Sequence, residues 1–133
     1  MSMSERILQD AAAAHDISYV TLRYFNVAGA DPKGRAGEIG KPTHLVKAAA
    51  QIALGHRKEK LKIYGNDYQT PDGTAIRDYV HVSDLAQAHL AALGRLRGDG
   101  SSITLNCGYG RGSSVYEVIE AFRRVTGKAL DYE

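Results

Sequence analysis

Residues 61–85 read LKIYGNDYQTPDGTAIRDYVHVSDL and decide the fold of the chain. The apolar start, residues 61–64, predicts a short strand. Two turns are expected at 65–67 and 71–73, where Gly, Asn and Asp supply the backbone angles that a reversal needs. The alternating run 76–82 predicts a second strand, and residues 83–84 predict the start of a helix. A strand, two turns, a strand and a helix therefore follow one another without a linker.

Arg77 lies at the start of the second strand, between the turns and the helix. A guanidinium group is permanently charged and binds anionic oxygens with two parallel hydrogen bonds, so Arg77 could hold a phosphate. The neighbouring Asp78 offers another interpretation, an ion pair at a strand edge. The residues alone leave both possibilities open and favour the ion pair.

Helices and strands alternate along the rest of the chain. Further strands are expected at 17–25, 103–107 and 128–133, with the first of them buried and parallel. Helices are expected at 4–15, between a Thr43 cap and Gly55, at 84–96, and at 115–126. A long loop should connect them over residues 26–42. This order predicts an α/β fold with a largely parallel sheet, of which the chain holds only half.

Local signals mark the ends of these helices. Thr43 and Asp84 are expected to cap the second and third helices. Ser114 and Glu117 form a capping-box pattern before the last helix, and Gly127 predicts its end.

Composition excludes several functional classes. The chain has 133 residues, 44% of them hydrophobic, and a net charge of +2, which is too small to indicate a nucleic-acid partner. The histidines lack metal-ligand spacing, so no metal site is expected. No apolar run approaches the length of a membrane span, and no signal peptide is recognisable. The single cysteine, Cys107, excludes an intrachain disulfide, and together these features indicate a cytoplasmic protein.

Three segments resemble UDP-glucose 4-epimerases, members of the extended short-chain dehydrogenase/reductase family. Residues 65–86 resemble the family pattern G-N-D-Y-x-T-x-D-G-T-x-x-R-D-Y-[IV]-H-V-x-D-L-A nearly letter for letter. Residues 22–29 resemble L-R-Y-F-N-x-x-G, and the Gly-rich run after Ile103 resembles Y-N-L-G-x-G-x-G-x-S. The resemblance spans essentially the whole chain.

The resemblance implies the carboxyl-terminal part of a Rossmann-like fold with a substrate-binding subdomain, incomplete without an N-terminal half. Residues 1–27 and 76–107 would belong to the sheet of the NAD domain. Residues 28–75 and 108–133 would build the substrate-binding subdomain.

In this family NAD removes a hydride from C4 of a UDP-sugar and returns it to the other face, with the tyrosine of a Tyr-x-x-x-Lys motif as the base. The sugar is held by its UDP group, which supplies binding energy remote from the reacting carbon. This sequence contains neither Tyr-x-x-x-Lys nor the Gly-rich dinucleotide motif. It is therefore expected to be a fragment that carries the UDP-sugar side and no catalytic residue.

The resemblance also implies roles for residues near the phosphates and the cofactor. Asn26 and Arg77 match the positions that bind the phosphates of the UDP-sugar. Phe25 matches the position that contacts the nicotinamide end of NAD.

A second group of residues matches the positions around the nucleoside. His44 and Leu45 match the pair that approaches the uracil, although the family commonly has Asn where this chain has His44. Lys62, Ile63 and Tyr64 match the strand beside the uracil and ribose, and Tyr64 could stack on a ring.

The expected parent protein interconverts UDP-glucose and UDP-galactose and acts as a homodimer. One alternative is another NAD-dependent nucleotide-sugar enzyme, such as a dehydratase or decarboxylase. Another is a non-catalytic module that binds nucleotides or forms oligomers.

We predict that the 133-residue chain shows no epimerase activity with added NAD, because none of its eight tyrosines has a lysine four residues later. A coupled assay that follows UDP-galactose formation tests this. Turnover above the rate without protein would contradict it.

Overall fold

The computed structural model describes residues 2–40 and 43–133, and it has a mixed α/β fold. In chain order the elements are α1 (Met3–Ala14), β1 (Val20–Tyr24), β2 (Asn26–Ala28), α2 (Leu45–Ala53), β3 (Ile76–Arg77), β4 (Tyr79–His81), α3 (Val82–Gly98), β5 (Ile103–Cys107), β6 (Ser113–Ser114) and α4 (Val115–Thr126). Among the residues described, no helix is long and apolar enough to cross a bilayer.

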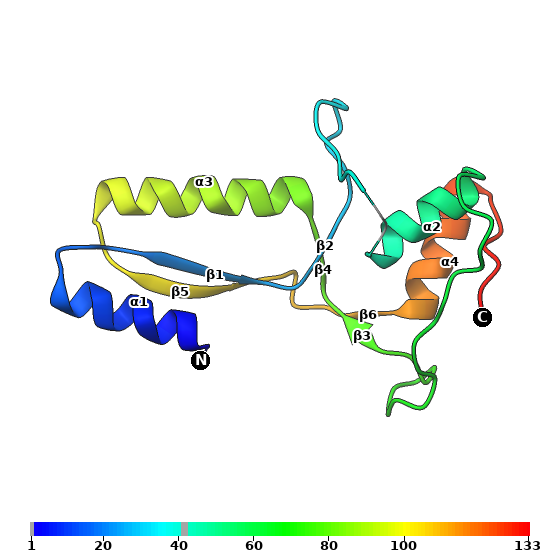
Figure 1. Ribbon diagram of the computed structural model, residues 1–133, viewed down its shortest axis with the longest axis horizontal. Helices are drawn as coiled ribbons and strands as arrows, with labels where there is room; N and C mark the ends of the chain where they lie inside the picture. The colour runs from blue at the N-terminus through cyan, green and yellow to red at the C-terminus, as the bar shows by residue number, and fades with distance from the viewer. Residues whose placement is uncertain (1, 41–42) are drawn as a thin grey trace.

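The strands form three two-stranded sheets in the described part of the chain, not the single half-sheet that was expected. The β1–β5 and β2–β4 pairs are parallel, as predicted, whereas β3 and β6 are antiparallel. The structure is elongated, with the β1–β5 pair near one end, α2 and α4 near the other, and the short strand pairs between them (Figure 1).

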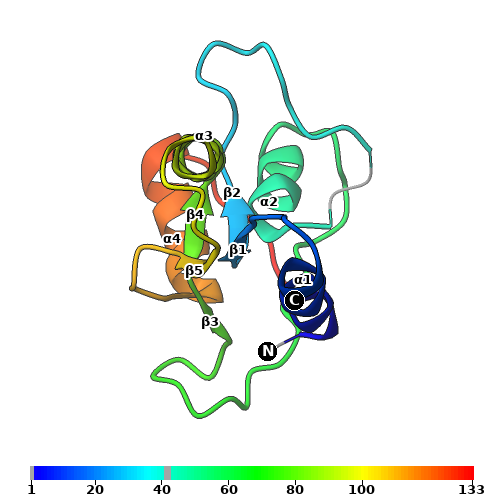
Figure 2. The same ribbon diagram turned by 90° about the vertical axis from the view of Figure 1, so that its left-hand side faces the viewer.

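The β1–β5 pair is sandwiched between two helices. In both views α3 lies on one side of the pair and α1 on the other (Figures 1 and 2). Residues 17–19 and Phe25 lie outside β1, so this strand is shorter than expected. The prediction that it is buried is wrong: Tyr24 is 52% exposed, because β1 has a single strand partner.

At the other end of the structure, a hydrophobic core is built on α2 and α4 (Figure 1). Its buried residues are Ala49, Leu61, Ile119 and Leu130. The strands expected at 61–64 and 128–133 are reduced to one parallel bridge between Leu61 and Tyr132. Three main-chain hydrogen bonds still join the two segments: the N–H of Leu61 donates to the carbonyl of residue 131 at 2.8 Å, that of Glu133 to Leu61 at 3.0 Å, and that of Ile63 to Glu133 at 2.8 Å. The two segments therefore lie side by side.

Two further expectations about the backbone need correction. The segment 26–28 is not the start of a loop but strand β2, which pairs with β4 in the register Asn26↔Tyr79 and Ala28↔His81. The loop that follows occupies residues 29–40, and the rest of the expected loop, 41–42, lies outside the described residues.

The helix caps were predicted correctly only for α4. Ser114 and Glu117 form the capping box, and Gly127 ends the helix in the left-handed conformation with φ of +67°. The caps predicted at Thr43 and Asp84 are wrong. His44 is the N-cap of α2 and makes no side-chain capping bond.

His81 is the N-cap of α3, and its Nδ1 accepts from the N–H of Ser83 at 3.1 Å. Because α3 follows β4 directly, it begins two residues earlier than expected. This places Asp84 in the first turn, where a negative charge suits the helix dipole.

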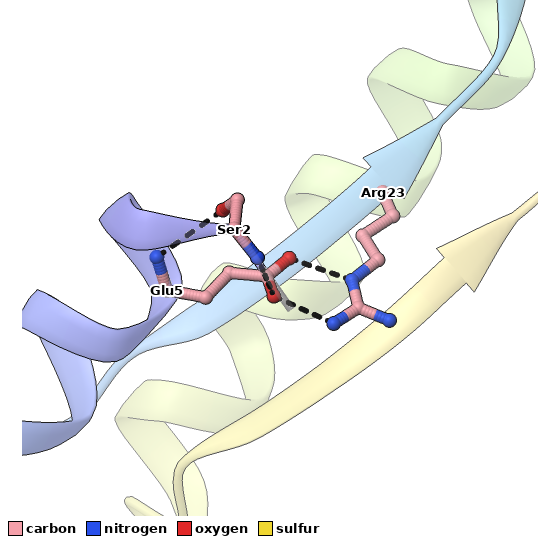
Figure 3. Close-up of polar contacts among 3 residues, drawn as sticks. All are labelled: Ser2, Glu5 and Arg23. Atoms are coloured by element: carbon pink, nitrogen blue, oxygen red, sulfur yellow. Dashed lines mark hydrogen bonds and ion pairs between the residues drawn. The ribbon is translucent and has the colours of Figure 1, made fainter.

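A bidentate ion pair fastens α1 to β1 (Figure 3). The Nε and Nη2 atoms of Arg23 each donate to the carboxylate of Glu5 at 2.6 Å. The same carboxylate accepts from the N–H of Ser2 at 3.1 Å and completes a capping box. Glu5 is only 7% exposed, and the hydrogen bonds from Arg23 are the main reason that its pKa falls to about 2.

The two turns of the 61–85 stretch pack directly on each other. The N–H of Tyr68 donates to the carbonyl of Gly73 at 2.9 Å. Gly73 has φ of +77°, and a Cβ there would lie 2.2 Å from the carbonyl oxygen of Asn66. Only glycine adopts this positive φ without strain and has no Cβ to collide with Asn66.

We predict that acid destabilises the protein partly through Glu5. Its pKa is about 2 in the fold against an ordinary value of 4.5, so the unfolded chain takes up a proton first as the pH falls. The stability that Glu5 contributes is present above about pH 4.5 and is lost progressively towards pH 2. Denaturant unfolding across this range should show a shallower pH dependence for Glu5→Gln.

Glu120→Gln is the matched control, because Glu120 forms an exposed pair with Arg123. It should follow the wild-type pH dependence. An unchanged slope in Glu5→Gln would contradict the role of the Glu5–Arg23 pair.

We predict that Gly73→Ala destabilises more than Gly34→Ala. Both glycines have positive φ, but a Cβ at Gly34 would meet no atom within 4 Å. Gly34→Ala should therefore cost about 1 kcal/mol from backbone strain alone. Gly73→Ala should cost about 2–4 kcal/mol, because overpacking adds to the strain. Equal free energies of unfolding for the two variants would contradict the close packing of the turns.

Candidate functional site

A cavity of about 630 Å³ lies between α2, the 57–68 segment and the start of β3 and β4. All seven residues predicted to bind substrate line it, although they come from four separate parts of the chain. They are Asn26, His44, Leu45, Lys62, Ile63, Tyr64 and Arg77. The structure thus gathers these residues around one space.

The strand segment 76–81 determines which side chains reach the cavity. Side chains alternate in an extended chain, and Arg77 and Tyr79 both line the cavity while Asp78 between them does not. Arg77 pairs with Ser113 in the β3–β6 ladder, and Tyr79 pairs with Asn26 in the β4–β2 ladder. The second pairing places Asn26 beside Tyr79 at the cavity wall.

Asp78 does not form the ion pair with Arg77 that the sequence alone favoured. Its carboxylate accepts from the main-chain N–H groups of Tyr109 at 3.2 Å and Gly110 at 2.9 Å. Arg77 donates from Nη1 to the carbonyl of Ile76 at 2.8 Å, and no carboxylate of residues 2–40 or 43–133 forms a salt bridge with it. The guanidinium therefore remains available to a ligand.

The cavity wall carries a surplus of positive charge. Arg57, Lys60, Lys62 and Arg77 line it, and none of the described lining residues is acidic. Of these four cations, Arg57 alone forms a salt bridge within residues 2–40 and 43–133, to Glu59, with Nε and Oε2 2.6 Å apart. Cations that converge on a concave surface without partners attract and hold anions.

The N-terminus of α2 also borders the cavity. Thr43, His44 and Leu45 line the wall, and His44 provides no side-chain hydrogen bond to the helix end. The first N–H groups of a helix have no acceptor within the helix, and the helix dipole makes this end positive. These groups can donate to phosphate or carbonyl oxygens of a ligand.

Aromatic rings complete the lining. Tyr64 is 81% exposed and offers a flat ring face to a ligand. Tyr68 lies against Gly65, where a Cβ would come within 2.7 Å of Cε2 of its ring. Burial raises the pKa of Tyr79 despite the nearby charge of Arg77, so this phenol is a neutral hydrogen-bond donor at neutral pH.

Sequence reasoning missed several lining residues, among them Tyr79, Tyr68, Arg57 and Lys60. Tyr79 could have been found, because it lies two residues after Arg77 on an extended segment and so shares its side. Arg57 and Lys60 could not, since no pattern distinguishes them from the other surface cations of the chain.

Phe25 is the one predicted site residue that does not line the cavity. It is 52% exposed, and its ring lies beside Gly108, where a Cβ would be 3.3 Å from Cδ2. Phe25 is an exposed ring and the chain contains no Gly-rich phosphate motif, so the described residues alone do not complete a dinucleotide site. The contact of Phe25 with the nicotinamide end of NAD stays a prediction. Among the residues that the structure covers, no cluster of His, Cys, Asp or Glu could hold a metal ion.

Comparison with known proteins identifies relatives of this chain. The model of the NAD dependent epimerase/dehydratase family matches residues 2–108. The UDP-glucose 4-epimerase of Azospirillum brasilense is 58% identical over 129 residues, which cover 96% of this chain and 37% of the relative. The chain therefore spans little more than a third of that protein.

Solved structures of UDP-glucose 4-epimerases also match the chain. The UDP-glucose 4-epimerase of Stenotrophomonas maltophila, with bound NAD and formylated UDP-arabinopyranose, matches with a TM-score of 0.90 and 44% identity over 98% of this chain and 39% of that one. The Bifidobacterium longum enzyme in complex with NAD+ and UDP matches with a TM-score of 0.87 and 41% identity over 97% of this chain and 39% of that one. From the family match and these relatives together, the chain belongs to the NAD-dependent epimerase/dehydratase family, and it is homologous to part of the UDP-glucose 4-epimerases.

Proposed function

We propose that this chain forms the UDP-sugar-binding part of an NAD-dependent UDP-glucose 4-epimerase, which interconverts UDP-glucose and UDP-galactose. The proposal rests on one cavity that all seven family-matched residues line. Its wall includes Lys60, Lys62 and Arg77, three cations that form no salt bridge within residues 2–40 and 43–133. A relative solved with NAD+ and UDP supports a uridine nucleotide as the ligand.

In this proposal the diphosphate lies against Arg77 and Asn26. The guanidinium of Arg77 has no carboxylate partner in the described chain and can form two parallel hydrogen bonds to phosphate oxygens. The amide of Asn26 can add a further donor from the neighbouring strand. Lys60 and Lys62 contribute positive charge to the same wall.

The nucleoside lies between the N-terminus of α2 and Tyr64. Main-chain N–H groups at the start of α2 can donate to the uracil carbonyl oxygens, and the exposed ring of Tyr64 can stack on a planar base. His44 stands where the family commonly has Asn and can also offer a ring N–H.

Holding the substrate by its UDP group has a chemical consequence. The binding energy comes from atoms that do not change between the two sugars, so the hexose can present either face of C4 without leaving the protein. The residues of this chain would bind and orient the substrate. NAD would supply the hydride chemistry, for which this chain alone has no fitting site.

We also propose the division of the chain inferred from the family. Residues 28–75 and 108–133 would form the substrate-binding subdomain, which agrees with the buried core that joins α2 to α4. Residues 1–27 and 76–107 would belong to the NAD domain, and they include the β1–β5 pair with α1 and α3.

We predict that the chain binds UDP and that Arg77→Ala weakens this binding about ten- to a hundredfold, the usual range for hydrogen bonds to a charged group. Isothermal titration calorimetry measures the change. Arg97→Ala is the matched control, because Arg97 is an exposed cation near the end of α3, away from the cavity. The control should bind UDP like the wild type. Equal affinity in Arg77→Ala would contradict the phosphate role.

A further inference from the structure

A buried polar cluster lies directly before the strand that carries Arg77. Thr74 is fully buried, and its hydroxyl donates to Oδ1 of Asp72 at 2.8 Å. The N–H of Thr74 donates to the same oxygen at 2.9 Å. The other carboxylate oxygen, Oδ2, accepts from the hydroxyl of Ser114, which is 3% exposed. Asp72 therefore joins the second turn of the 61–85 stretch to a residue 42 positions later.

This cluster is fastened to the start of α4. Ser114 is the N-cap of that helix, and the N–H of Val115 donates to the hydroxyl of Thr74 at 3.1 Å. Ser114 also pairs with Ile76 in the β3–β6 ladder. Ser114, which donates to the Asp72 carboxylate, is thus a direct backbone neighbour of strand β3.

Arg77 depends on its backbone for its direction. Its side chain makes a hydrogen bond only to the carbonyl of the preceding residue, and no ion pair within the described chain orients it. The position of a long side chain without such partners depends mainly on how firmly its Cα atom is fixed. Its backbone is held by the ladder to β6 on one side and by the Asp72 cluster just before it.

We propose that Asp72 is a positioning residue for diphosphate recognition, which fixes Arg77 at the cavity by holding Ser114 and Thr74. The inference rests on the proposed function and deepens it. Asp72 does not line the cavity, and its carboxylate is occupied by three hydrogen bonds, so it acts on a ligand only through Arg77. The hydrogen bond from Ser114 is the main cause that holds the pKa of Asp72 below its usual range, so the group stays charged at neutral pH.

The test compares UDP with uridine in titrations of the 133-residue chain. Asp72→Asn keeps the size of the side chain and replaces one of its two acceptor oxygens with an NH2 group, so it can no longer accept from both Ser114 and Thr74. It should raise the Kd for UDP about tenfold and leave the Kd for uridine unchanged, because only the diphosphate meets Arg77. Asp67→Asn is the matched control: Asp67 is exposed in the neighbouring turn, and it should bind both ligands like the wild type.

A double-mutant cycle separates positioning from general support. In an Arg77→Ala background, Asp72→Asn should cause no further loss of UDP affinity, because the residue through which it acts is gone. A full additional loss, or an equal loss of uridine affinity, would overturn the inference. Wild-type UDP binding in Asp72→Asn would also overturn it, while the effect of Arg77→Ala would leave the proposed function standing. Absence of UDP binding in the wild type would instead reject the proposed function.

Near-UV circular dichroism shows whether Asp72→Asn folds. If it does not, Thr74→Val and Thr74→Ser decide the question. Thr74→Val removes the hydroxyl that links Asp72 to Val115 and should weaken UDP but not uridine. Thr74→Ser keeps the hydroxyl and should bind like the wild type. Equal UDP affinities in the two variants would contradict the inference.

Discussion

Side chains alternate along residues 76–81, and this alternation determines which of them face the cavity. It directs Arg77 and Tyr79 to the cavity and Asp78 to the Gly-rich turn, where it accepts two main-chain hydrogen bonds. A slip of one residue would reverse these directions and place a carboxylate among the cations. The register is therefore as important to anion binding as the identity of the arginine.

Two ladders hold this register from different sides. β3 pairs with β6 and β4 pairs with β2, so the chain changes partners at Asp78. The carboxylate of Asp78 occupies this changeover point, and Gly108 makes room for it, since a Cβ there would lie 2.5 Å from Oδ2. Glycine at this position is a packing requirement of the site.

Features set by neighbouring residues could be predicted from the sequence. The capping box at Ser114 and the left-handed Gly127 follow from a few adjacent residues, and both were found. Features set by long-range pairing were missed. Strand β2 exists only because β4 lies beside it, and α3 starts early because it follows β4 directly.

The residues of the site could be predicted from the sequence for a different reason. The residues that meet at the cavity could be named through a family resemblance, whereas spacing alone favoured an Arg77–Asp78 ion pair that the fold does not form. Arg57 and Lys60 follow no local pattern, and their position depends on how the chain returns from α2 to the buried Leu61. Burial was the weakest inference, as the exposed face of β1 shows.

We expect the guanidinium of Arg77, held in register, to bind the diphosphate of a uridine nucleotide. A crystal structure of the chain with UDP would show this contact. Phosphate oxygens should lie within hydrogen-bond distance of the Arg77 guanidinium, and the base should lie between Tyr64 and the start of α2. UDP bound outside this cavity, or a guanidinium turned onto a carboxylate with the phosphates elsewhere, would contradict this expectation.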